Sequence, residues 1–497
     1  MKKPIKYSKN SVNKNILLVF PGKMEHEITS LNLMPLSLLY LAGALRSICE
    51  KIQIFDVNLY EKGTETRRLD EIISECNPSI IGINCLAAGI FPDVMALSRH
   101  IKEKNAAVKI ITGGAHPTMF AREIMANCPY IDAVVLGEGE YAAQKLLRYY
   151  YDEINAEELD SVCLRINDKI VYYKKSAYIE NMDDMPFPGY EFFDFNKYSA
   201  DARNWLNPKK IDLYGVMMPL LTSRSCPNMC NFCAMNQVMG KRFRARSAES
   251  VFDEIAYLHN TYGINYFTIL DDNFTFDKPR VKKLCNMIID SGMQLYFDNM
   301  AGLMISTLDR ELIELMAKAG FMRVGIAVES GNDYIRNEVM RKNVSREKII
   351  EAVDLCRENG LLVTAFFLIG MPEETEESLR DTYEMIKELN CAGVWLSHLI
   401  PFPGTKVYEQ CQRDGLFVFD NEQETLWNGE YHKRKSVVSK VVLSLEAVAR
   451  DYHIKPYDMT LEKLAEWDGK IQTLINIKTR DWKERNIKKR AASSLPV

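Results

Sequence analysis

The sequence lacks a long uninterrupted apolar segment. Within the 497 residues, the apolar run Ile16–Phe20 is too short for a signal peptide. Leu31–Leu45 contains Pro35 and is too short to span a bilayer. The chain also lacks an excess of charge of one sign, since 63 basic and 67 acidic side chains give a formal net charge of −4. We therefore expect no integral membrane segment, and no nucleic acid as a bulk electrostatic partner.

The twelve cysteines lack the pattern of a disulfide framework, because nine are scattered singly, and this favours a reducing, cytoplasmic setting. The other three, Cys226, Cys230 and Cys233, are spaced C-x3-C-x2-C, and the next cysteine is Cys285. Three thiolates can hold three irons of a cubane iron–sulfur cluster and leave the fourth iron open. Zinc usually requires four N/S ligands in closely spaced pairs. The spacing therefore favours a [4Fe-4S] cluster over a zinc site or three unrelated buried thiols.

The length suggests two or three domains. Residues 1–150 alternate short apolar strands with helices, which predicts a Rossmann-like, doubly wound parallel sheet. The expected strands end in two glycine-rich loops, Gly113-Gly114-Ala115-His116-Pro117 and Gly137-Glu138-Gly139-Glu140. Such sheets bind ligands at the carboxyl ends of their strands, although turn chemistry alone also explains paired glycines. The expected strands are Ile16–Phe20, Ile52–Val57, Ile80–Asn84, Val108–Thr112 and Ala133–Leu136.

Residues 151–205 are predicted to form a connector with a hairpin around Asn167-Asp168. In residues 206–410 a strand–helix unit then repeats, which predicts a partial (β/α)6 barrel of the TIM type with active-site residues at the C-terminal ends of the strands. Residues 411–497 are expected to be mainly helical. The expected barrel strands are Leu213–Pro219, Tyr266–Leu270, Leu295–Asp298, Val324–Val328, Leu362–Ile369 and Val394–Ile400.

The segment Ser223-Arg224-Ser225-Cys226-Pro227, followed by Cys230 and Asn231-Phe232-Cys233, resembles the signature of the radical S-adenosylmethionine superfamily. The family places an aromatic residue before the third cysteine, and Phe232 fits this position. The resemblance implies that the amino and carboxylate groups of S-adenosylmethionine chelate the open iron. An electron from an external donor such as flavodoxin or ferredoxin then cleaves the sulfonium to give a 5′-deoxyadenosyl radical.

The same resemblance implies further cofactor contacts at the strand ends. Asp271, Asp272 and Asn273 occupy the position that meets the amino group of the methionine moiety, with helix capping as the alternative. Gly370 and Pro372 belong to a turn, GMPEET, similar to the G-x-P-x-E-T turn that shapes the adenine pocket through its backbone.

Glu329 and Ser330 follow the fourth barrel strand and are similar to the E-S-G motif that meets the ribose and carboxylate of S-adenosylmethionine. An ion pair of Glu329 with Arg323 or Arg336 is the alternative for this carboxylate. After the sixth strand, PFPGT resembles the P-x-P-G-T motif common in the class that contains B12, and it can also serve only as a rigid turn.

The early PLSLLYLAGAL, the GGAHPT loop and the GEGE loop are similar to the cobalamin-binding domain of B12-dependent radical S-adenosylmethionine enzymes. The chain lacks the Asp-x-His-x-x-Gly motif of other B12 proteins, as this class also does, so His116 is expected to pack on the corrin or bond to backbone rather than bind cobalt. Cys85 is expected to point into the core. The expected cobalamin contacts are Asn84, Leu86, Gly113, Gly114, His116, Gly137 and Glu138.

The resemblance implies a cobalamin-dependent methyltransferase, in which the deoxyadenosyl radical removes hydrogen from an unactivated carbon and methylcobalamin delivers a methyl group. Three alternatives stay open: a radical cyclase or oxidase, a relative that has lost cobalamin, and a non-catalytic iron–sulfur redox protein. The substrate can be a small molecule, a lipid or a peptide. The basic terminal helix is expected to be a solvated face, with membrane or anionic-substrate contact as the alternative.

Overall fold

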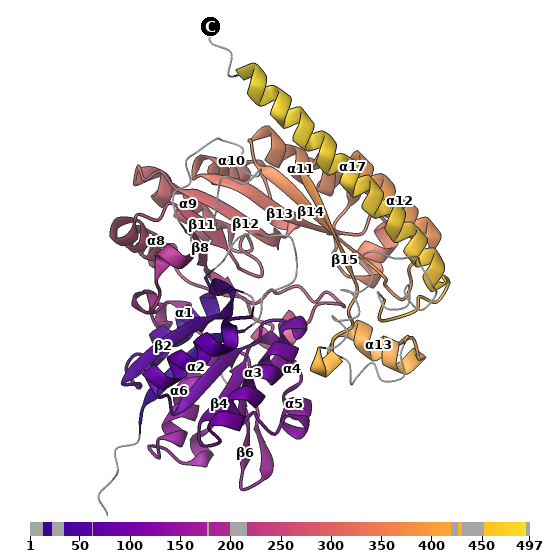
Figure 1. Ribbon diagram of the computed structural model, residues 1–497. Helices are drawn as coiled ribbons and strands as arrows, with labels where there is room; N and C mark the ends of the chain where they lie inside the picture. The colour runs from indigo at the N-terminus through magenta and orange to yellow at the C-terminus, as the bar shows by residue number, and fades with distance from the viewer. Residues whose placement is uncertain are drawn as a thin grey trace, which may run out of the picture.

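The structure is a computed structural model. It describes residues 13–21, 34–61, 63–175, 178–198, 216–418, 426–429 and 452–493. Two α/β units lie side by side, with a long C-terminal helix running along the outside of the second unit (Figure 1). The expected boundary at residues 205 and 206, and the expected start of the first barrel strand at Leu213, lie outside the described residues.

The first unit is a seven-stranded sheet in the order β2-β1-β3-β4-β5-β6-β7. Its strands β1 to β5 are parallel, and Ile16 to Val19 of β1 are fully buried because helices cover both faces of the sheet. The hairpin expected in the connector is present, and it extends this sheet by two antiparallel strands. The elements are β1 (Asn15–Phe20), α1 (Leu36–Leu45), β2 (Lys51–Asp56), α2 (Glu65–Cys76), β3 (Ile80–Asn84), α3 (Phe91–Lys104), β4 (Lys109–Gly113), α4 (Ala115–Met119), α5 (Ala121–Asn127), β5 (Ala133–Val135), α6 (Gly139–Tyr150), β6 (Val162–Ile166) and β7 (Lys169–Tyr173).

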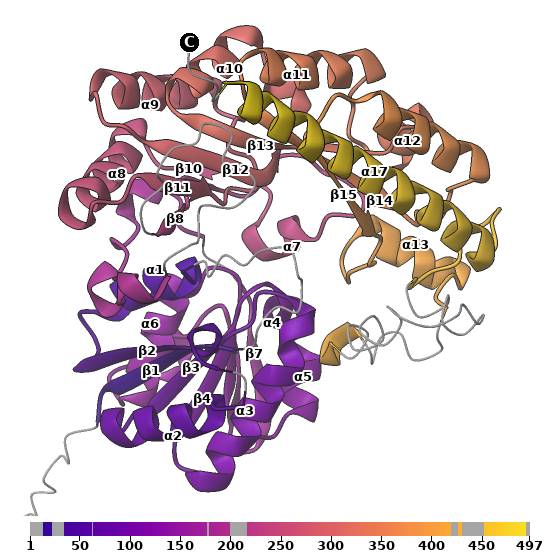
Figure 2. The same ribbon diagram turned by 45° about the horizontal axis from the view of Figure 1, so that its top comes forward.

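The second unit is a six-stranded parallel sheet in the order β8-β11-β12-β13-β14-β15, curved into a partial barrel with its helices outside (Figure 2). The helices begin where the sequence offers caps: the side chains of Ser247, Asp277, Asp309, Ser345 and Thr375 each accept a backbone N–H at a helix start. The elements are β8 (Met217–Leu220), β9 (Ser223–Arg224), α7 (Met235–Met239), β10 (Arg244–Ala245), α8 (Ala248–Tyr262), β11 (Tyr266–Ile269), α9 (Lys278–Asp290), β12 (Tyr296–Leu303), α10 (Arg310–Lys318), β13 (Phe321–Glu329), a π-helical turn (Ile335–Val339), α11 (Arg346–Glu358), β14 (Leu362–Ile369), α12 (Glu376–Glu388), β15 (Gly393–His398), α13 (Lys406–Asp414) and α17 (Leu461–Ser493).

The two units share one continuous hydrophobic core, which contains Leu39 of α1 as well as Val251 of α8. Helix α17 packs on α12 and β15. Across the described ranges, no helix combines the length and the apolar character needed to cross a membrane. The predicted fold class, a Rossmann-like sheet followed by a partial barrel and a helical C-terminal region, is confirmed.

Candidate active site

The cysteine loop lies between β9 and α7, at the carboxyl end of β8. Cys226, Cys230 and Cys233 are free and partly exposed, whereas eight of the other nine cysteines are buried. Burial raises the pKa of the Cys230 thiol, and it raises the pKa of Cys233 to about 11. Iron must therefore compete with protons for these thiols, so cluster assembly requires the iron–thiolate bond to offset the cost of ionisation.

The surroundings of these thiols suit an anionic cluster. The side-chain amide of Asn273 donates to Cys226 Sγ at 3.5 Å, and the backbone N–H of Met235 lowers the pKa of Cys233. The charge of Lys342 acts on both Cys226 and Cys230. In the part of the chain that is described, no three His, Cys, Asp or Glu side chains are arranged to bind one metal ion. A cubane has no such requirement, because each thiolate binds its own iron. The charges of Cys226, Cys230 and Cys233 act on one another, so the three thiols lie close together, as a shared cluster requires.

Asp271 and Asp272 hold the start of the cysteine loop. The buried Asp271 carboxylate accepts hydrogen bonds from Thr222 N at 2.7 Å and Ser223 Oγ at 2.6 Å. Asp272 accepts from Ser225 N at 2.9 Å, and burial raises the pKa of Asp272 to about 6. Asp271 is therefore turned toward the loop backbone, while Asn273 lies beside the first cysteine.

Glu329 ends β13 with a φ of 68°, a left-handed conformation that is uncommon for a side chain of this size. Its carboxylate accepts a hydrogen bond from Lys342 Nζ at 3.1 Å, and this partner was not expected from the sequence. The two expected alternatives are not formed, because Arg323 pairs with Asp298 and Arg336 pairs with a neighbouring aspartate. The Glu329 charge raises the pKa of Lys342 although burial opposes it. This largely buried ion pair therefore lies next to Cys226 and Cys230.

The turn after β14 is closed by a carboxyl group. Glu374 is fully buried and accepts hydrogen bonds from the backbone N–H groups of Gly370 and Met371. Burial raises the pKa of Glu374 to about 8. Tyr457 N donates to the carbonyl of Pro372 at 2.8 Å, so the C-terminal region also supports this turn. Its backbone is thus fixed from two sides.

Two further expected residues lie close to these elements. Ser330 is buried directly after Glu329, and its hydroxyl accepts from Asn332 N at 3.2 Å. Phe232 packs against the hydrophobic cluster that contains Met371. The cysteine loop and the turn after β14 are therefore neighbours in space, although about 140 residues separate them in the sequence.

The expected cobalamin loops lie together at the carboxyl ends of β3, β4 and β5. Asn84 and Gly113 are paired across β3 and β4, and Leu86 is 44% exposed. Gly114 has a φ of 117°, and a Cβ atom there would lie 2.4 Å from the carbonyl oxygen of Cys85. Only glycine fits this approach between the two loops. Cys85 itself is buried in the core, as expected.

His116 is buried in the first unit. Its Nε2 donates to the carbonyl oxygen of Trp427 at 2.7 Å, and its ring packs against Phe91 and Phe120. The structure therefore places this imidazole in a hydrogen bond to backbone, one of the two roles expected for it.

Gly137 and Glu138, which follow β5, face the second unit. A Cβ atom at Gly137 would lie 3.1 Å from the carbonyl of Val238 in α7. The Glu138 carboxylate pairs with Arg244 at 2.5 Å and with Arg224 at 3.4 Å. The structure thus places Glu138 in ion pairs between the units.

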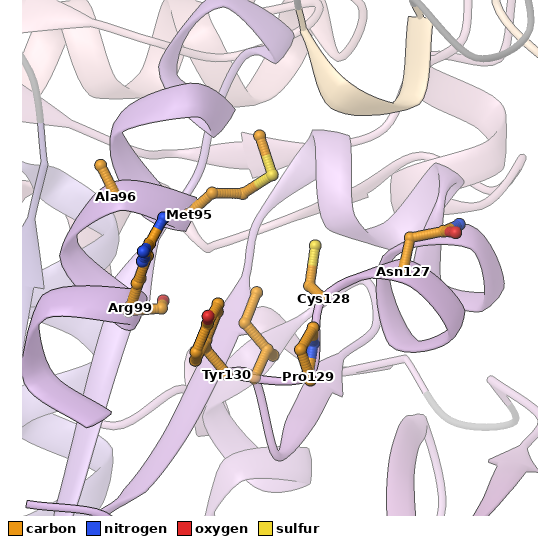
Figure 3. Close-up of a pocket in the computed structure, with 9 residues that line it drawn as sticks. Met95, Ala96, Arg99, Asn127, Cys128, Pro129 and Tyr130 are labelled. Carbon is orange, nitrogen blue, oxygen red and sulfur yellow. The ribbon is translucent and has the colours of Figure 1, made fainter. Parts of the chain in front are cut away.

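A cavity of about 260 Å³ lies elsewhere in the first unit, between α3 and the segment joining α5 to β5 (Figure 3). Met95 and Arg99 line one side, and Cys128 and Tyr130 line the other. Because Tyr130 precedes β5, the cavity lies at the amino end of that strand, away from the glycine-rich loops.

Lys342, Glu374 and Arg224 are the important residues that sequence reasoning left out. Glu374 and Arg224 lie inside recognised motifs. A charged side chain in a motif that is expected to be buried could have prompted a search for its partner. Lys342 follows the π-helical turn and has no motif or periodicity to indicate it.

Two family profiles match the chain: the B12 binding domain over residues 30–147 and the Radical SAM superfamily over residues 220–386. These ranges contain the glycine-rich loops and the cysteine loop respectively. Both matches agree with the positions of the two candidate cofactor sites.

Among curated proteins, the chain is 30% identical to an uncharacterized methyltransferase of Pyrococcus horikoshii over 78% of this chain and 80% of that protein. It is 25% identical to the cytidylyl-2-hydroxyethylphosphonate methyltransferase of Streptomyces wedmorensis, over 80% of each. It is also 25% identical to the anaerobic magnesium-protoporphyrin IX monomethyl ester cyclase of Cereibacter sphaeroides, over 77% of this chain and 60% of the cyclase.

Among solved structures, the fold is similar to the radical S-adenosylmethionine methyltransferase TsrM of Kitasatospora setae, which was solved with cobalamin and a [4Fe-4S] cluster bound. The TM-score is 0.66, with 19% identity over 80% of this chain and 78% of TsrM. At this identity the likeness supports the fold.

Proposed function

The chain belongs to the radical S-adenosylmethionine superfamily and carries a B12-binding domain, and from this membership we propose that it methylates a carbon atom of a biosynthetic substrate. The observation that supports the proposal is the match to both families on one chain, with the cysteine loop and the glycine-rich loops, the two candidate cofactor sites, facing the boundary between the units. Methylation is better supported than cyclisation, because the two first relatives are named methyltransferases.

When bound, the cluster with S-adenosylmethionine would supply radical chemistry, and cobalamin would carry the methyl group. The chain's own residues bind and orient these groups. Cys226, Cys230 and Cys233 would hold the cluster, with one iron left for the methionine moiety. Asp272 and Asn273 accept hydrogen bonds from its amino group, while Asp271 fixes the loop that carries Cys226.

Glu329 accepts hydrogen bonds from the ribose, with Lys342 holding its carboxylate in place. Ser330 supports the backbone that follows Glu329. Gly370 and Pro372 line the adenine pocket through backbone atoms that Glu374 and Tyr457 fix. Phe232 closes the space between the third cysteine and this turn.

On the cobalamin side, Asn84 and Leu86 would contact the corrin, and Gly113, Gly114, Gly137 and the His116 loop would allow backbone to approach it. The His116 imidazole keeps its hydrogen bond to the Trp427 carbonyl and does not act as a ligand of cobalt. Glu138 contributes by holding the loop after β5 against the barrel.

The substrate remains a small molecule, lipid or peptide, and an external one-electron donor such as flavodoxin or ferredoxin supplies electrons. All twelve cysteines are free, which supports a reducing, cytoplasmic location.

The test uses protein reconstituted anaerobically with iron, sulfide and hydroxocobalamin. This protein is incubated with cell extract and S-adenosylmethionine labelled with CD3 on its methyl group, and products are compared by mass spectrometry. A methyltransferase yields a compound carrying all three deuterium atoms, with 5′-deoxyadenosine and S-adenosylhomocysteine as co-products. A new product without deuterium, accompanied by 5′-deoxyadenosine alone, would instead assign the chain to the cyclases.

A further inference from the structure

A buried network of charges joins the two units. Glu138 and Glu140, at the start of α6, are 8% and 5% exposed, and both face Arg224 of the barrel. Arg224 reaches Glu140 through both terminal nitrogens and reaches Glu138 at 3.4 Å. Arg244 pairs with the opposite side of Glu138 at 2.5 Å. The carboxylates of one unit thus enclose a guanidinium of the other.

The network continues through aromatic residues. The Arg224 guanidinium lies 5.9 Å from the centroid of the Tyr40 ring on α1, and Arg246 donates to the Tyr40 hydroxyl at 3.4 Å. Arg246 also pairs with the buried Glu254, which accepts from the Tyr190 hydroxyl. Three arginines and three glutamates balance in charge, as Arg224, Arg244 and Arg246 against Glu138, Glu140 and Glu254.

Stability alone does not account for such a network. Removing six charges from water is costly, and well-packed apolar side chains often stabilise an interface equally well. What ion pairs add is geometry, because a bidentate arginine fixes both the distance and the orientation of its partners.

The position of Arg224 indicates what this geometry serves. Arg224 precedes Cys226 by two residues, and the residue between them, Ser225, is held at a φ of 70°. Ser225 N donates to Asp272, and its hydroxyl donates to the carbonyl of Gly240 at 2.6 Å. The chain from Arg224 to Cys226 therefore has little freedom. Glu140, at the other end of the ion pair, lies in the second glycine-rich loop and in the first turn of α6.

We propose that Glu140 and Arg224 are positioning residues that fix the cysteine loop relative to the glycine-rich loops of the first unit, and so set the separation of the two cofactors. This inference rests on the proposed function. It adds that the ion pair between Glu140 and Arg224 determines how precisely the two cofactors are positioned relative to one another.

The test replaces Glu140 with glutamine, which keeps its shape and removes its charge. Glu138 remains beside Arg224, so the guanidinium keeps a counter-charge and the variant is expected to fold. Arg224→Lys is the second variant, because it keeps the charge and loses the bidentate geometry. The matched control is Glu180→Gln, which removes an ion pair with Arg242 at 2.7 Å. The side chains of this control pair are 64% (Glu180) and 79% (Arg242) exposed, whereas Glu140 and Arg224 are buried.

The first readout needs no substrate. Pulsed electron paramagnetic resonance measures the distance between the reduced cluster and bound cob(II)alamin. Wild type and Glu180→Gln should give one narrow distribution, whereas Glu140→Gln and Arg224→Lys should give a broadened or shifted one. In a separate turnover assay with cell extract and S-adenosylmethionine, S-adenosylhomocysteine formed per 5′-deoxyadenosine should fall about ten- to a hundredfold, since misplacement by about 1 Å has effects of this size. Unchanged distances, or an equal fall of both products, would overturn the proposal.

The second readout needs no cobalamin. Hydrogen exchange of the peptide that spans the segment from Thr222 to Cys226 should be about tenfold faster in Glu140→Gln than in wild type, and unchanged in Glu180→Gln. If wild type binds no cobalamin, the proposed function fails, and this comparison still decides whether Glu140 anchors the loop. Equal exchange in all three proteins would show that it does not.

Discussion

The ion pair between Glu329 and Lys342 allows a quantitative prediction. Its side chains are 14% and 12% exposed, and the oxygen and nitrogen lie 3.1 Å apart. Glu329 also keeps a left-handed backbone, a conformation that costs about 1–3 kcal/mol and persists mainly at functional sites. We expect Glu329→Ala to lower the affinity for S-adenosylmethionine about ten- to a hundredfold, since a charge-assisted hydrogen bond contributes roughly 1.5–3 kcal/mol.

Lys342→Met distinguishes the binding of S-adenosylmethionine by Glu329 from the support that Lys342 gives to the Glu329 carboxylate. This variant leaves the carboxylate in place but removes the group that holds it, so the affinity should fall less than in Glu329→Ala. The double variant should be less impaired than the sum of the two, with a coupling of about 0.5–3 kcal/mol, because each single change leaves one buried charge without its partner.

The assay is calorimetric titration of S-adenosylmethionine into reconstituted protein, with iron content as the check on cluster assembly. Glu191→Gln, which removes an exposed ion pair with Arg46, is the control and should bind as wild type does. Wild-type affinity in Glu329→Ala with full iron content would refute the reasoning and leave Glu329 as a structural partner of Lys342.

Three other changes test separate parts of the site. Replacing Cys226, Cys230 or Cys233 with alanine should abolish 5′-deoxyadenosine formation, whereas Cys285→Ala, a change in the buried core, should retain it; the reverse pattern would contradict the ligand assignment. Bound cob(II)alamin should show no nitrogen splitting by electron paramagnetic resonance, and a nitrogen triplet lost in His116→Ala would contradict the bond to Trp427. Burial raises the pKa of Glu374 from 4.5 to about 8, so the protonated form contributes stability that is lost as the pH rises through this range. The melting temperature of Glu374→Gln should therefore exceed that of wild type by an amount that grows between about pH 5 and pH 9. A difference that stays constant with pH would contradict burial as the cause of the raised pKa.

The sequence predicted strands well where apolar runs are unbroken, and less well where buried charge interrupts them. Leu362–Ile369 was predicted with the observed bounds, whereas the preceding barrel strand begins at Phe321 rather than Val324. Arg323 interrupts that run, but its pairing with Asp298 of the neighbouring strand keeps it inside the barrel. Periodicity cannot indicate such pairing, because the two residues meet only in the folded sheet.

The site was predictable to the extent that its residues lie in local motifs. The cysteine loop was located from its spacing and the strand-end residues from the family resemblance, while the partners that hold them come from distant segments. Trp427 meets His116 across 311 positions, and Lys342 meets Glu329 across an irregular π-helical turn. Glu138 was expected at cobalamin, and only the packing of the two units shows its pairing with Arg244.

The central claim is that one chain carries both an iron–sulfur cluster and cobalamin, and the most direct test is the metal content of the reconstituted protein. After removal of unbound cofactors, mass spectrometry of the metals should give about four iron atoms and one cobalt atom per chain. Cys226→Ala should lose iron and keep cobalt, because the two sites lie on different units. Cobalt at background level in protein with a full complement of iron would contradict the account.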